Sequence, residues 1–358
     1  MLEGLEVSEI NFSEALHSTA TSRLDPEYFN RTALKTLAKL KNSCKLGDFV
    51  KSGYRVVYET TDSIDRAEGE RQGLPYFLQA ADITTPFISA ESMGCVAESD
   101  WHRYPKGRIS PGELLIEVKG RAEKIALVPE DFPNNTLVTG SCFKLNTYEK
   151  VDQYFLAAYL TCRHGQILKD RLKTNLLVSY LAKDDLYRLP VPRVSTKLKE
   201  LIRSVFDSCF LEHRKGNAFL KDAEMGLIQA LSLENWQAPE LLSYVGNSSQ
   251  AFSAERLDAE YFNPAKSAAL VTLRAASDFT VGDLFSSIRQ LWHPDDGLPT
   301  DLVRNYDLND ALTPFLNGAK APVARAEIAS TKKCIRAGDL VVSRLRSYLR
   351  EIAVVELV

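Results

Sequence analysis

The sequence RLDPEYFN at residues 23–30 returns about 233 residues later as RLDAEYFN at residues 256–263. Six of the first seven residues are identical, and helix-like sequence follows both copies. Solenoid repeats are only about 20–50 residues long, so one interval of this size is typical of a domain plan that is used twice. We call each copy of this segment the tag.

Three further segments follow the two tags in the same order. LGDF at residues 46–49 returns as VGDL at 281–284, ISPGELLI at 109–116 as IRAGDLVV at 335–342, and IALV at 125–128 as IAVV at 352–355. The offsets stay between 226 and 235, so a common frame persists while the segments between diverge. Nothing in the second copy matches the sequence from residue 142 onward, so the second domain is expected to be incomplete.

Hydrophobic periodicity indicates an α+β protein. A helix is expected to begin at Asp25-Pro26, because an acidic cap and a proline suit the first turn, and to end near residue 42. A second helix is expected over residues 151–172. Short strands separated by charged loops are expected at residues 54–58, 74–78, 113–118, 125–128 and 142–145.

Leu189-Pro190-Val191-Pro192 breaks the chain, and a long helix is predicted after it, over about residues 195–233. It would reach roughly 55 Å, and its apolar stripe favours an antiparallel helix pair with a second copy or a partner. The predicted fold class is therefore a tandem of mixed α/β domains with a long spacer helix. The expected divisions are an N-terminal arm (1–22), a first domain (23–194), the long helix (195–234), a linker (235–255) and an incomplete second domain (256–358).

The bulk composition narrows the function classes. The 358 residues are 45% hydrophobic, which suits two ordinary domains, and the net charge of −3 excludes a uniformly basic nucleic-acid binder. The six cysteines include no CxxC pair and no signal peptide opens the chain, so a cytoplasmic location is expected. The sequence has no apolar run of membrane-spanning length and only single histidines, which predicts neither membrane insertion nor a structural metal.

Four features together resemble the specificity subunit of type I restriction-modification systems. They are the repeated RLDxEYF tag, the GxPYxxxxDI element at residues 73–83, the Gly-acidic-Leu strand at residues 112–116, and the LPVP segment before the long helix. Each motif is short, but their repeated order is specific, and the resemblance covers nearly the whole chain.

The resemblance implies a DNA-recognition subunit without catalysis of its own. In that family, two target recognition domains each bind one half of a split double-stranded DNA sequence, and two paired long helices set the distance between the halves. The subunit recruits methylation subunits, which transfer a methyl group from S-adenosylmethionine to adenine N6, and a restriction subunit, which uses ATP and magnesium. This chain departs from the pattern in its incomplete second domain and its single spacer helix.

Basic residues fall at matching points of the two copies, which favours a DNA-binding face over a merely solvated strand. In the second copy, alternation along a strand places Arg344 and Arg346 on one side, with Tyr348 two positions further. The candidates from the two basic segments are Arg108, Lys119, Arg121, Lys124, Lys332, Lys333, Arg344, Arg346, Tyr348 and Arg350.

Two other segments supply candidate DNA contacts. Lys173 and Asn175 lie in a polar loop after the helix at residues 151–172, and Gln79 lies just past a strand. The alternative interpretations are an ordinary helix-ending loop for the first segment and a strand-end turn for the second.

Two function classes compete with DNA recognition. Glu117-Val118-Lys119, with Asp100 upstream, matches the Asp…Glu-x-Lys arrangement in which nucleases hold magnesium, although the second copy has Ser343-Arg344-Leu345 at that place. The other alternative is a protein–protein adaptor with repeated polypeptide-binding domains. The sequence has no GxGxxG, no P-loop and no Asn/Asp-Pro-Pro-aromatic motif, so no cofactor is expected in this chain.

The tag itself is predicted to be structural. Arg23 with Asp25, and Arg256 with Asp258, are expected to form ion pairs that fix a helix start. The Tyr-Phe pair that follows each of them is expected to pack into its domain.

Overall fold

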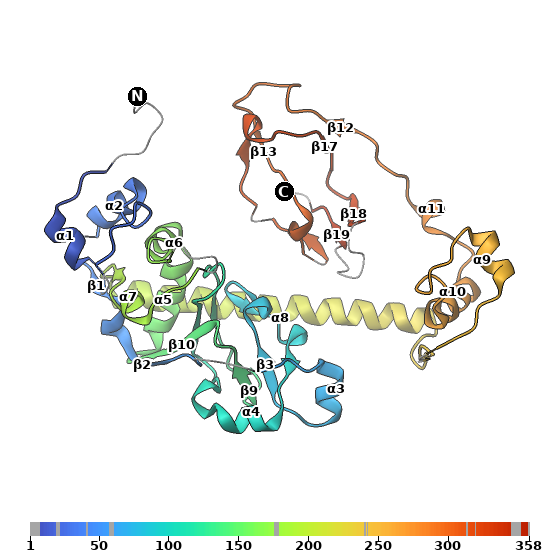
Figure 1. Ribbon diagram of the computed structural model, residues 1–358, viewed down its shortest axis with the longest axis horizontal. Coiled ribbons are helices and arrows are strands. Elements are labelled where there is room, and N and C mark those ends of the chain that lie inside the picture. Colours follow the sequence, from blue (N-terminus) through green and yellow to red (C-terminus); the bar gives the residue numbers. More distant parts are fainter. Residues whose placement is uncertain are drawn as a thin grey trace. The chain divides into compact units, whose positions relative to one another are not determined.

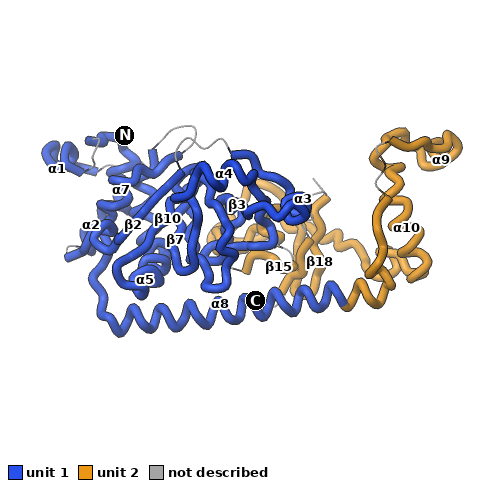
Figure 2. Tube along the Cα trace, turned by 90° about the horizontal axis from the view of Figure 1, so that it is seen from below, with its two compact units in different colours: residues 1–225 blue, residues 226–358 orange. Residues whose placement is uncertain are grey.

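The computed structural model describes residues 8–18, 22–40, 42–56, 61–174, 179–239, 241, 243–312, 314–318, 320–344 and 352–356. The chain divides into two compact units, unit 1 (residues 1–225) and unit 2 (residues 226–358), which Figure 2 distinguishes by colour. The fold is α+β, as the sequence predicts, because short strands and helices alternate in both units and one long helix follows the strands of unit 1.

Unit 1 is built on short strands. Its largest sheet has the order β2–β10–β7–β8, a second has the order β6–β3–β9, and β1–β11 and β4–β5 are two-stranded. The strands are β1 (Cys44–Lys45), β2 (Val50–Tyr54), β3 (Tyr76–Leu78), β4 (Ile83–Thr84), β5 (Phe87–Ile88), β6 (Gly94–Cys95), β7 (Leu114–Glu117), β8 (Ile125–Leu127), β9 (Thr136–Val138), β10 (Cys142–Thr147) and β11 (Pro190–Val191). Four of the five predicted strands are confirmed. Of the strand expected at residues 54–58, Tyr54 is the last residue of β2, residues 55 and 56 are in no strand, and residues 57 and 58 lie outside the described residues.

The helices of unit 1 are mostly short. They are α1 (Phe12–His17), α2 (Arg31–Ala38), α3 (Arg66–Arg71), α4 (Glu98–Arg103), α5 (Lys150–Thr161), α6 (Arg163–Asp170), α7 (Lys183–Tyr187) and the long α8 (Thr196–Ala230). Alternation along β7 divides its side chains between two cores. Leu114 and Ile116 join the core that α5 and α6 cover, whereas Leu115 joins a second core with Ile83 and Val138. Burial of each of these side chains contributes about 1.5–3 kcal/mol to the free energy of unfolding.

The helix that the sequence predicts from Asp25-Pro26 to about residue 42 is α2, and it begins later, at Arg31, and ends at Ala38. The Asp25 carboxylate accepts a hydrogen bond from the Tyr28 amide at 3.1 Å, which closes a turn in place of the first helical turn. The Asn30 side chain then caps α2 by accepting from the Ala33 amide. The acidic residue therefore caps a turn, and the asparagine caps the helix.

The prediction of a single helix over residues 151–172 is wrong, because Cys162 divides this segment into α5 and α6. Cys162 is extended, with φ −68° and ψ 157°, and its Sγ atom accepts a hydrogen bond from the Gly165 amide. The apolar positions continue through the break, so periodicity alone does not reveal it.

The long helix is confirmed as α8, whose 35 residues give a length of about 52 Å. Figure 2 shows it running along one side of unit 1. Ile202, Phe206 and Phe210 pack against the core of unit 1, and the Lys199 ammonium lies 2.5 Å from the Asp152 carboxylate of α5. Among the helices within the described ranges, none has both the length and the apolarity that a membrane crossing needs.

Unit 2 uses the same kinds of element (Figure 1). Its sheets have the orders β14–β15–β19–β18, β12–β17 and β13–β16. Its elements are α9 (Ser248–Ala254), α10 (Pro264–Ala276), α11 (Val281–Leu284), β12 (Leu291–Trp292), β13 (Leu302–Val303), β14 (Ala311–Leu312), β15 (Phe315–Leu316), β16 (Val323–Ala324), β17 (Lys332–Lys333), β18 (Leu340–Val342) and β19 (Ile352–Val354).

The repeat is confirmed at the level of backbone hydrogen bonds. β7 pairs with β8 so that Leu114 faces Leu127, and β18 pairs with β19 so that Leu340 faces Val354, which is the equivalent register. Before these strands, Gly112 and Gly338 both have positive φ, 81° and 88°, which glycine adopts without strain. Both glycine amides donate to the strand opposite, at the Val128 and Val355 carbonyls.

The structure extends the repeat into a segment where the two sequences diverge. The hairpin β4–β5 has its counterpart in β14–β15, and both hairpins follow a turn of the same design. In these turns Asp82 accepts from the Gln79 amide and Asp310 from the Asp307 amide, each at 2.8 Å. The two stretches, residues 79–88 and 307–316, therefore align at a constant offset of 228.

Candidate nucleic-acid interface

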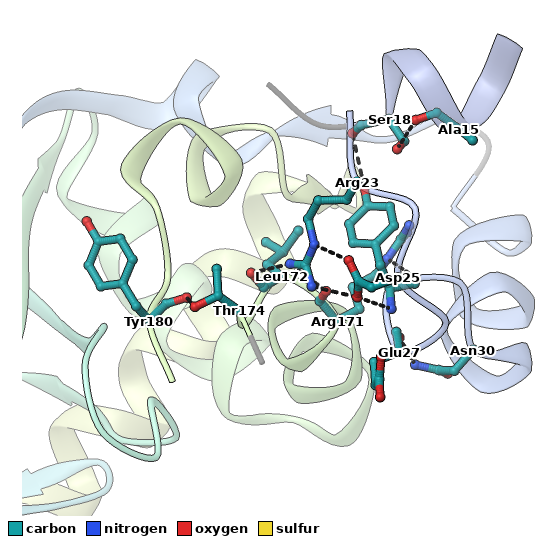
Figure 3. A network of polar contacts seen from close by, with 11 residues as sticks. Ala15, Ser18, Arg23, Asp25, Glu27, Asn30, Arg171, Leu172, Thr174 and Tyr180 are labelled. Carbon is teal, nitrogen blue, oxygen red and sulfur yellow. Dashed lines mark hydrogen bonds and ion pairs between the residues drawn. The ribbon is translucent and has the colours of Figure 1, made fainter. Parts of the chain in front are cut away.

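The first tag forms a polar network around Arg23 and Asp25 (Figure 3). The Arg23 Nε atom lies 2.6 Å from Asp25 Oδ2, which lowers the pKa of the Asp25 carboxyl, and Arg23 Nη1 donates to the Leu172 carbonyl at 2.9 Å. The Arg171 guanidinium lies 3.8 Å from the centre of the Tyr28 ring, and its Nε donates to the Tyr28 carbonyl. The predicted ion pair is confirmed in unit 1, but it does not fix a helix start, because Asn30 caps α2, and the tag instead fastens the segment after α6.

The second tag keeps the ion pair but not the packing. Arg256 Nε lies 2.6 Å from Asp258 Oδ2, as in the first tag. However, Tyr261 is 47% exposed, whereas Tyr28 is 4% exposed. The prediction that the second Tyr-Phe pair packs into its domain is therefore wrong for Tyr261. Its ring is covered by the guanidinium of Arg256 at 4.5 Å, and that side chain is itself half exposed, whereas the buried Arg171 covers Tyr28.

The loop between β7 and β8, residues 118–124, presents exposed cations in unit 1. The buried Glu117 carboxylate closes the loop by accepting hydrogen bonds from the Glu123 and Lys124 amides, at 2.9 and 3.1 Å. Lys119 and Arg121 are exposed between these two ends. The loop therefore holds two cationic side chains in solvent on a backbone that a buried acid fixes. We call it the β7–β8 loop.

A buried lysine supports the β7–β8 loop from α6. The Lys169 side chain is fully buried, and its Nζ atom donates to the Ala122 carbonyl within the loop. Burial lowers the pKa of Lys169 to about 8, and the neighbouring Asp170 carboxylate opposes that shift. The loop therefore rests on a charge that is costly to bury.

This buried charge predicts a pH dependence of stability. The pKa of Lys169 in the folded chain, about 8, lies below its ordinary value of 10.5, so the unfolded chain binds this proton more tightly. The free energy of unfolding should therefore rise by about 3 kcal/mol between pH 8 and 10.5, relative to a Lys169→Met variant. Below pH 8 the difference should stay constant. Urea unfolding from pH 7 to 10.5 measures it, and Lys106→Met, at an exposed lysine, is the control.

Gln79 and Lys124, predicted from separate segments, lie together at one end of the β7–β8 loop. The Lys124 Nζ atom donates to the Ala80 carbonyl at 2.7 Å, which ties the loop to the turn after β3. Gln79 is exposed on that turn. Lys124 therefore positions the turn, and Gln79 exposes its side-chain amide on the same turn.

Lys173 lies close to the same loop, but acidic neighbours surround it. Its Nζ atom lies 2.8 Å from Asp170 and 3.9 Å from Glu123, which belongs to the loop. Lys173 is therefore largely neutralised in this structure. Asn175, its predicted companion, lies outside the described residues.

Sequence reasoning missed two cations, Arg55 and Lys183, which lie at the Lys119 end of the β7–β8 loop. Lys119 forms a β-bridge with Tyr180, and the Arg55 guanidinium lies 4.7 Å from the centre of the Tyr180 ring. Arg55, Tyr180 and Lys183 line a hollow of about 220 Å³. No local signal distinguishes Arg55 or Lys183 from other surface cations, because both reach the site through contacts between distant parts of the chain.

Arg108 is placed differently from the other candidates of unit 1. Its guanidinium lies 4.1 Å from the centre of the Trp101 ring, and its Nη2 atom donates to the Trp101 carbonyl. Arg108 also forms a β-bridge with Leu137 of β9. The structure therefore engages this side chain in packing beside β9 and does not bring it to the β7–β8 loop.

The candidates of unit 2 are described only in part. Lys332 and Lys333 form β17, opposite Trp292 and Leu291, and Lys333 is exposed. Strand β18 ends at Val342, so Arg344 lies exposed past the strand and not within it as predicted. Arg346, Tyr348 and Arg350 lie outside the described residues.

The nuclease-like residues do not form a metal site in the described structure. The Glu117 carboxylate accepts hydrogen bonds from the Glu123 and Lys124 amides of its own loop. In the parts of the chain that the structure describes, no three His, Cys, Asp or Glu side chains are grouped closely enough to hold a metal ion. The geometry gives Glu117 a structural part in the β7–β8 loop.

Comparison with known proteins gives matches to solved structures alone. No family model and no curated protein matches the chain. A type I restriction-modification S subunit from M. genitalium is 16% identical, with a TM-score of 0.35, over 55% of this chain and 48% of that chain. The HsdS subunit from Thermoanaerobacter tengcongensis is 17% identical, with a TM-score of 0.29, over 54% and 44%. The type IIG restriction endonuclease BpuSI is 10% identical, with a TM-score of 0.38, over 51% and 28%. The chain thus covers less than half of each of these proteins.

Proposed function

We propose that this chain is the DNA sequence-recognition subunit of a type I restriction-modification complex. The observation that carries the proposal is the use of one domain plan twice, with the same β7–β8 and β18–β19 register and with basic residues after the first strand of each pair. A split DNA target needs two readers of one design, and this repeat supplies such a pair. The sequence motifs of the specificity subunits support the same assignment.

The chemistry of the β7–β8 loop suits duplex DNA. Lys119 and Arg121 are exposed cations on a fixed backbone, which suits phosphate contacts. The amide of Gln79 both donates and accepts, as bidentate contact with adenine N6 and N7 in the major groove requires. Arg55 and Lys183 extend the positive surface around Tyr180. In this proposal the cations provide affinity and Gln79 contributes sequence preference.

The proposed partners follow from the same assignment. Methylation subunits would bring S-adenosylmethionine, and a restriction subunit would bring ATP and magnesium, while this chain contributes no catalytic group. The spacer helix α8 would set the distance between two DNA half-sites, which needs a second helix beside it. We infer that a second copy of this chain, or a partner subunit, supplies that helix.

An uncovered apolar stripe on α8 makes helix pairing testable. Leu198, Leu201, Val205, Phe219 and Leu227 are all exposed, and they fall on one side of the helix. Leu201→Glu should therefore reduce self-association at least tenfold, measured as the dimer dissociation constant by sedimentation. Ala218→Glu, on another side of α8, is the matched control and should leave the constant unchanged. A chain that stays monomeric at high concentration would assign the second helix to another subunit.

Sequence-specific DNA binding is the direct test of the function. Selection from a pool of random duplexes with the full chain, or with its complex, should enrich one sequence, and affinity for it should fall steeply with salt. A combined Arg344→Ala and Arg346→Ala variant should weaken binding in the assembled complex. Equal binding to selected and scrambled duplexes at every salt concentration would instead favour the adaptor interpretation, and magnesium-dependent cleavage lost in Glu117→Ala would favour the nuclease.

A further inference from the structure

A cavity of about 400 Å³ lies within unit 1, between α8 and the elements that α8 crosses (Figure 2). Its walls come from β5, the segment after β8, α5 and α8. Its lining residues belong neither to the β7–β8 loop nor to the hollow beside Tyr180. The volume falls within the range of about 300–1,000 Å³ that is typical of small-molecule sites. The chemistry of the lining side chains therefore decides which class of ligand the cavity can bind.

Specific contacts hold the α8 wall of the cavity in place. The Phe87 ring stacks on the His213 ring of α8, with centres 4.1 Å apart and planes 8° apart. The Phe210 ring of α8 meets Phe87 edge to face, with centres 5.5 Å apart. Arg214 Nη1 donates to Asp131 Oδ2 at 2.8 Å, which ties α8 to the segment after β8. The cavity is therefore preformed, because both of its sides are fixed by contacts between α8 and the rest of unit 1.

The inner wall of the cavity is apolar and buried. Four of its side chains are each at most 7% exposed: Ile88, Leu127, Val128 and Phe132. The rings of Phe87 and Phe210 extend this apolar surface toward α8. A flat apolar group gains from burial against such a wall, and an aromatic ring also gains from edge or face contacts with the phenylalanine rings. The inner wall therefore favours a ligand with a planar apolar body.

One buried polar side chain of the cavity has no partner for its polar atom. Tyr154 of α5 lines the cavity and is 8% exposed, and its hydroxyl forms no hydrogen bond with any residue that the structure describes. Burial raises the pKa of Tyr154, and the carboxylates of Asp207 and Glu130, which line the same cavity, raise it further. The hydroxyl therefore lies near the acidic residues of the cavity and stays protonated. A buried hydroxyl without a partner is unfavourable, so a ligand that hydrogen-bonds with it is expected to gain affinity.

The exposed rim of the cavity is acidic. Four carboxylates line the cavity against one arginine, Arg214: Glu91, Glu130, Asp131 and Asp207. Arg214 pairs with Asp131, and Lys150 pairs with Glu130. Asp207 lies 3.7 Å from Arg203 in an exposed pair that water screens, and Glu91 has no ion pair among the described residues. The remaining negative charge favours a cation over an anion, and a cation beside aromatic rings gains further attraction.

We propose that this cavity binds a small organic cation with a planar apolar body, such as an aromatic amine. The ring of the ligand packs against the apolar inner wall and beside Phe87 and Phe210. Its ammonium group stays at the rim among the carboxylates, where Glu91 and Asp207 offset its charge, and the Tyr154 hydroxyl accepts a hydrogen bond from it. The proposal concerns a small molecule and does not rest on DNA recognition.

Occupation of the cavity would strengthen the contact between α8 and the rest of unit 1. One wall belongs to α8, with Asp207, Phe210 and His213, and the opposite wall belongs to the body of the unit, with Val128 and Phe132. A ligand between these walls contacts both. Local opening of α8 away from the body would then also break the contacts of the ligand, so bound ligand opposes it. Slower amide hydrogen exchange on both walls is therefore an expected sign of binding.

Tryptamine and indole-3-propionic acid are matched probes, because they share one ring system and carry opposite charges. Titration calorimetry with the full chain should give saturable binding of one tryptamine per chain, roughly tenfold or more tighter than that of indole-3-propionic acid. Hydrogen exchange should slow in residues 127–133 and 207–217 when tryptamine is added, and exchange in the β7–β8 loop should not change. Failure of tryptamine to saturate, or equal affinity for the two probes, would overturn the proposal. DNA is absent from this experiment, so its outcome is separate from that of the proposed function.

Variants of nearly unchanged shape complete the test. Glu91→Gln with Asp207→Asn should weaken tryptamine binding roughly tenfold or more, whereas Asp222→Asn with Glu224→Gln, at exposed positions of α8 outside the cavity, should leave it unchanged. Tyr154→Phe should weaken it about three- to tenfold without lowering the stability of the chain, because the hydroxyl has no partner among the described residues. Wild-type affinity in both cavity variants, or an equal loss in the control variant, would contradict binding in this cavity.

Discussion

Replacing Lys119 and Arg121 together by alanine is expected to weaken DNA binding roughly a hundredfold at low salt, and to reduce the slope of log affinity against log salt by about 2. Both side chains are exposed on the β7–β8 loop, and in the proposed function each of them neutralises one phosphate. Each contact that is lost then leaves about one more counterion on the DNA. The free energy of unfolding should change by less than about 0.5 kcal/mol, because neither side chain is buried.

Affinity should be measured by fluorescence anisotropy with the selected duplex at four or more salt concentrations. The matched control removes two exposed lysines that are distant from the loop in the sequence, Lys39→Ala with Lys221→Ala, and it should keep the wild-type slope. Gln79→Ala should give the complementary result. The difference in affinity between the selected duplex and other duplexes should become smaller, while the slope of log affinity against log salt stays unchanged. A Lys119 and Arg121 variant with the wild-type slope would remove the β7–β8 loop from the interface.

The sequence predicts the parts of this protein that depend on local pattern. The tag repeats as an Arg–Asp pair with the same 2.6 Å distance in both copies, and the long helix follows from its uninterrupted periodicity. The strands β7 and β8 follow from short apolar runs bounded by turns, and the same frame returns in the second copy. Local sequence patterns are sufficient to predict these elements, because their hydrogen bonds join residues that are near in sequence or lie in adjacent strands.

The assembly of the candidate site is a different matter, because it depends on contacts between distant segments. Lys124 reaches the Ala80 carbonyl and Lys169 reaches the Ala122 carbonyl, and each pair is separated by more than forty residues. Sequence reasoning named Lys124 as a DNA contact and did not consider Lys169. The Lys169 side chain is buried and supports the loop, and a pattern of charges along the sequence does not show which charged residues are buried.

The helix break at Cys162 is the other feature that the sequence concealed, and it predicts the largest change in stability. A Cβ atom on Gly165 would lie 1.9 Å from the Tyr159 carbonyl oxygen and 2.7 Å from its carbon. These atoms are backbone of α5, so they cannot turn aside as a flexible side chain would. Gly165→Ala should therefore separate α6 from α5 and lower the free energy of unfolding by about 3 kcal/mol or more.

The consequence should extend to the tag and to the β7–β8 loop. α6 places Lys169 against the Ala122 carbonyl, and the residue that follows α6, Arg171, donates to the Tyr28 carbonyl. Urea unfolding measures the loss, and hydrogen exchange should show faster exchange in residues 118–124 of the Gly165→Ala variant under native conditions. A loss below about 1 kcal/mol would mean that α5 and α6 separate without cost, which contradicts the tight crossing.

Gly216 is the matched control, because the same substitution there should have the opposite sign. It lies within α8, and a Cβ atom on it would meet no atom within 4 Å. Alanine restricts the unfolded chain and favours the helix, so Gly216→Ala should raise the free energy of unfolding by about 0.5–1 kcal/mol. The two glycines differ in their surroundings and not in their helical conformation. Opposite signs would therefore assign the loss at Gly165 to the close approach of α5 and α6, whereas two losses of equal size would point to a general intolerance of alanine.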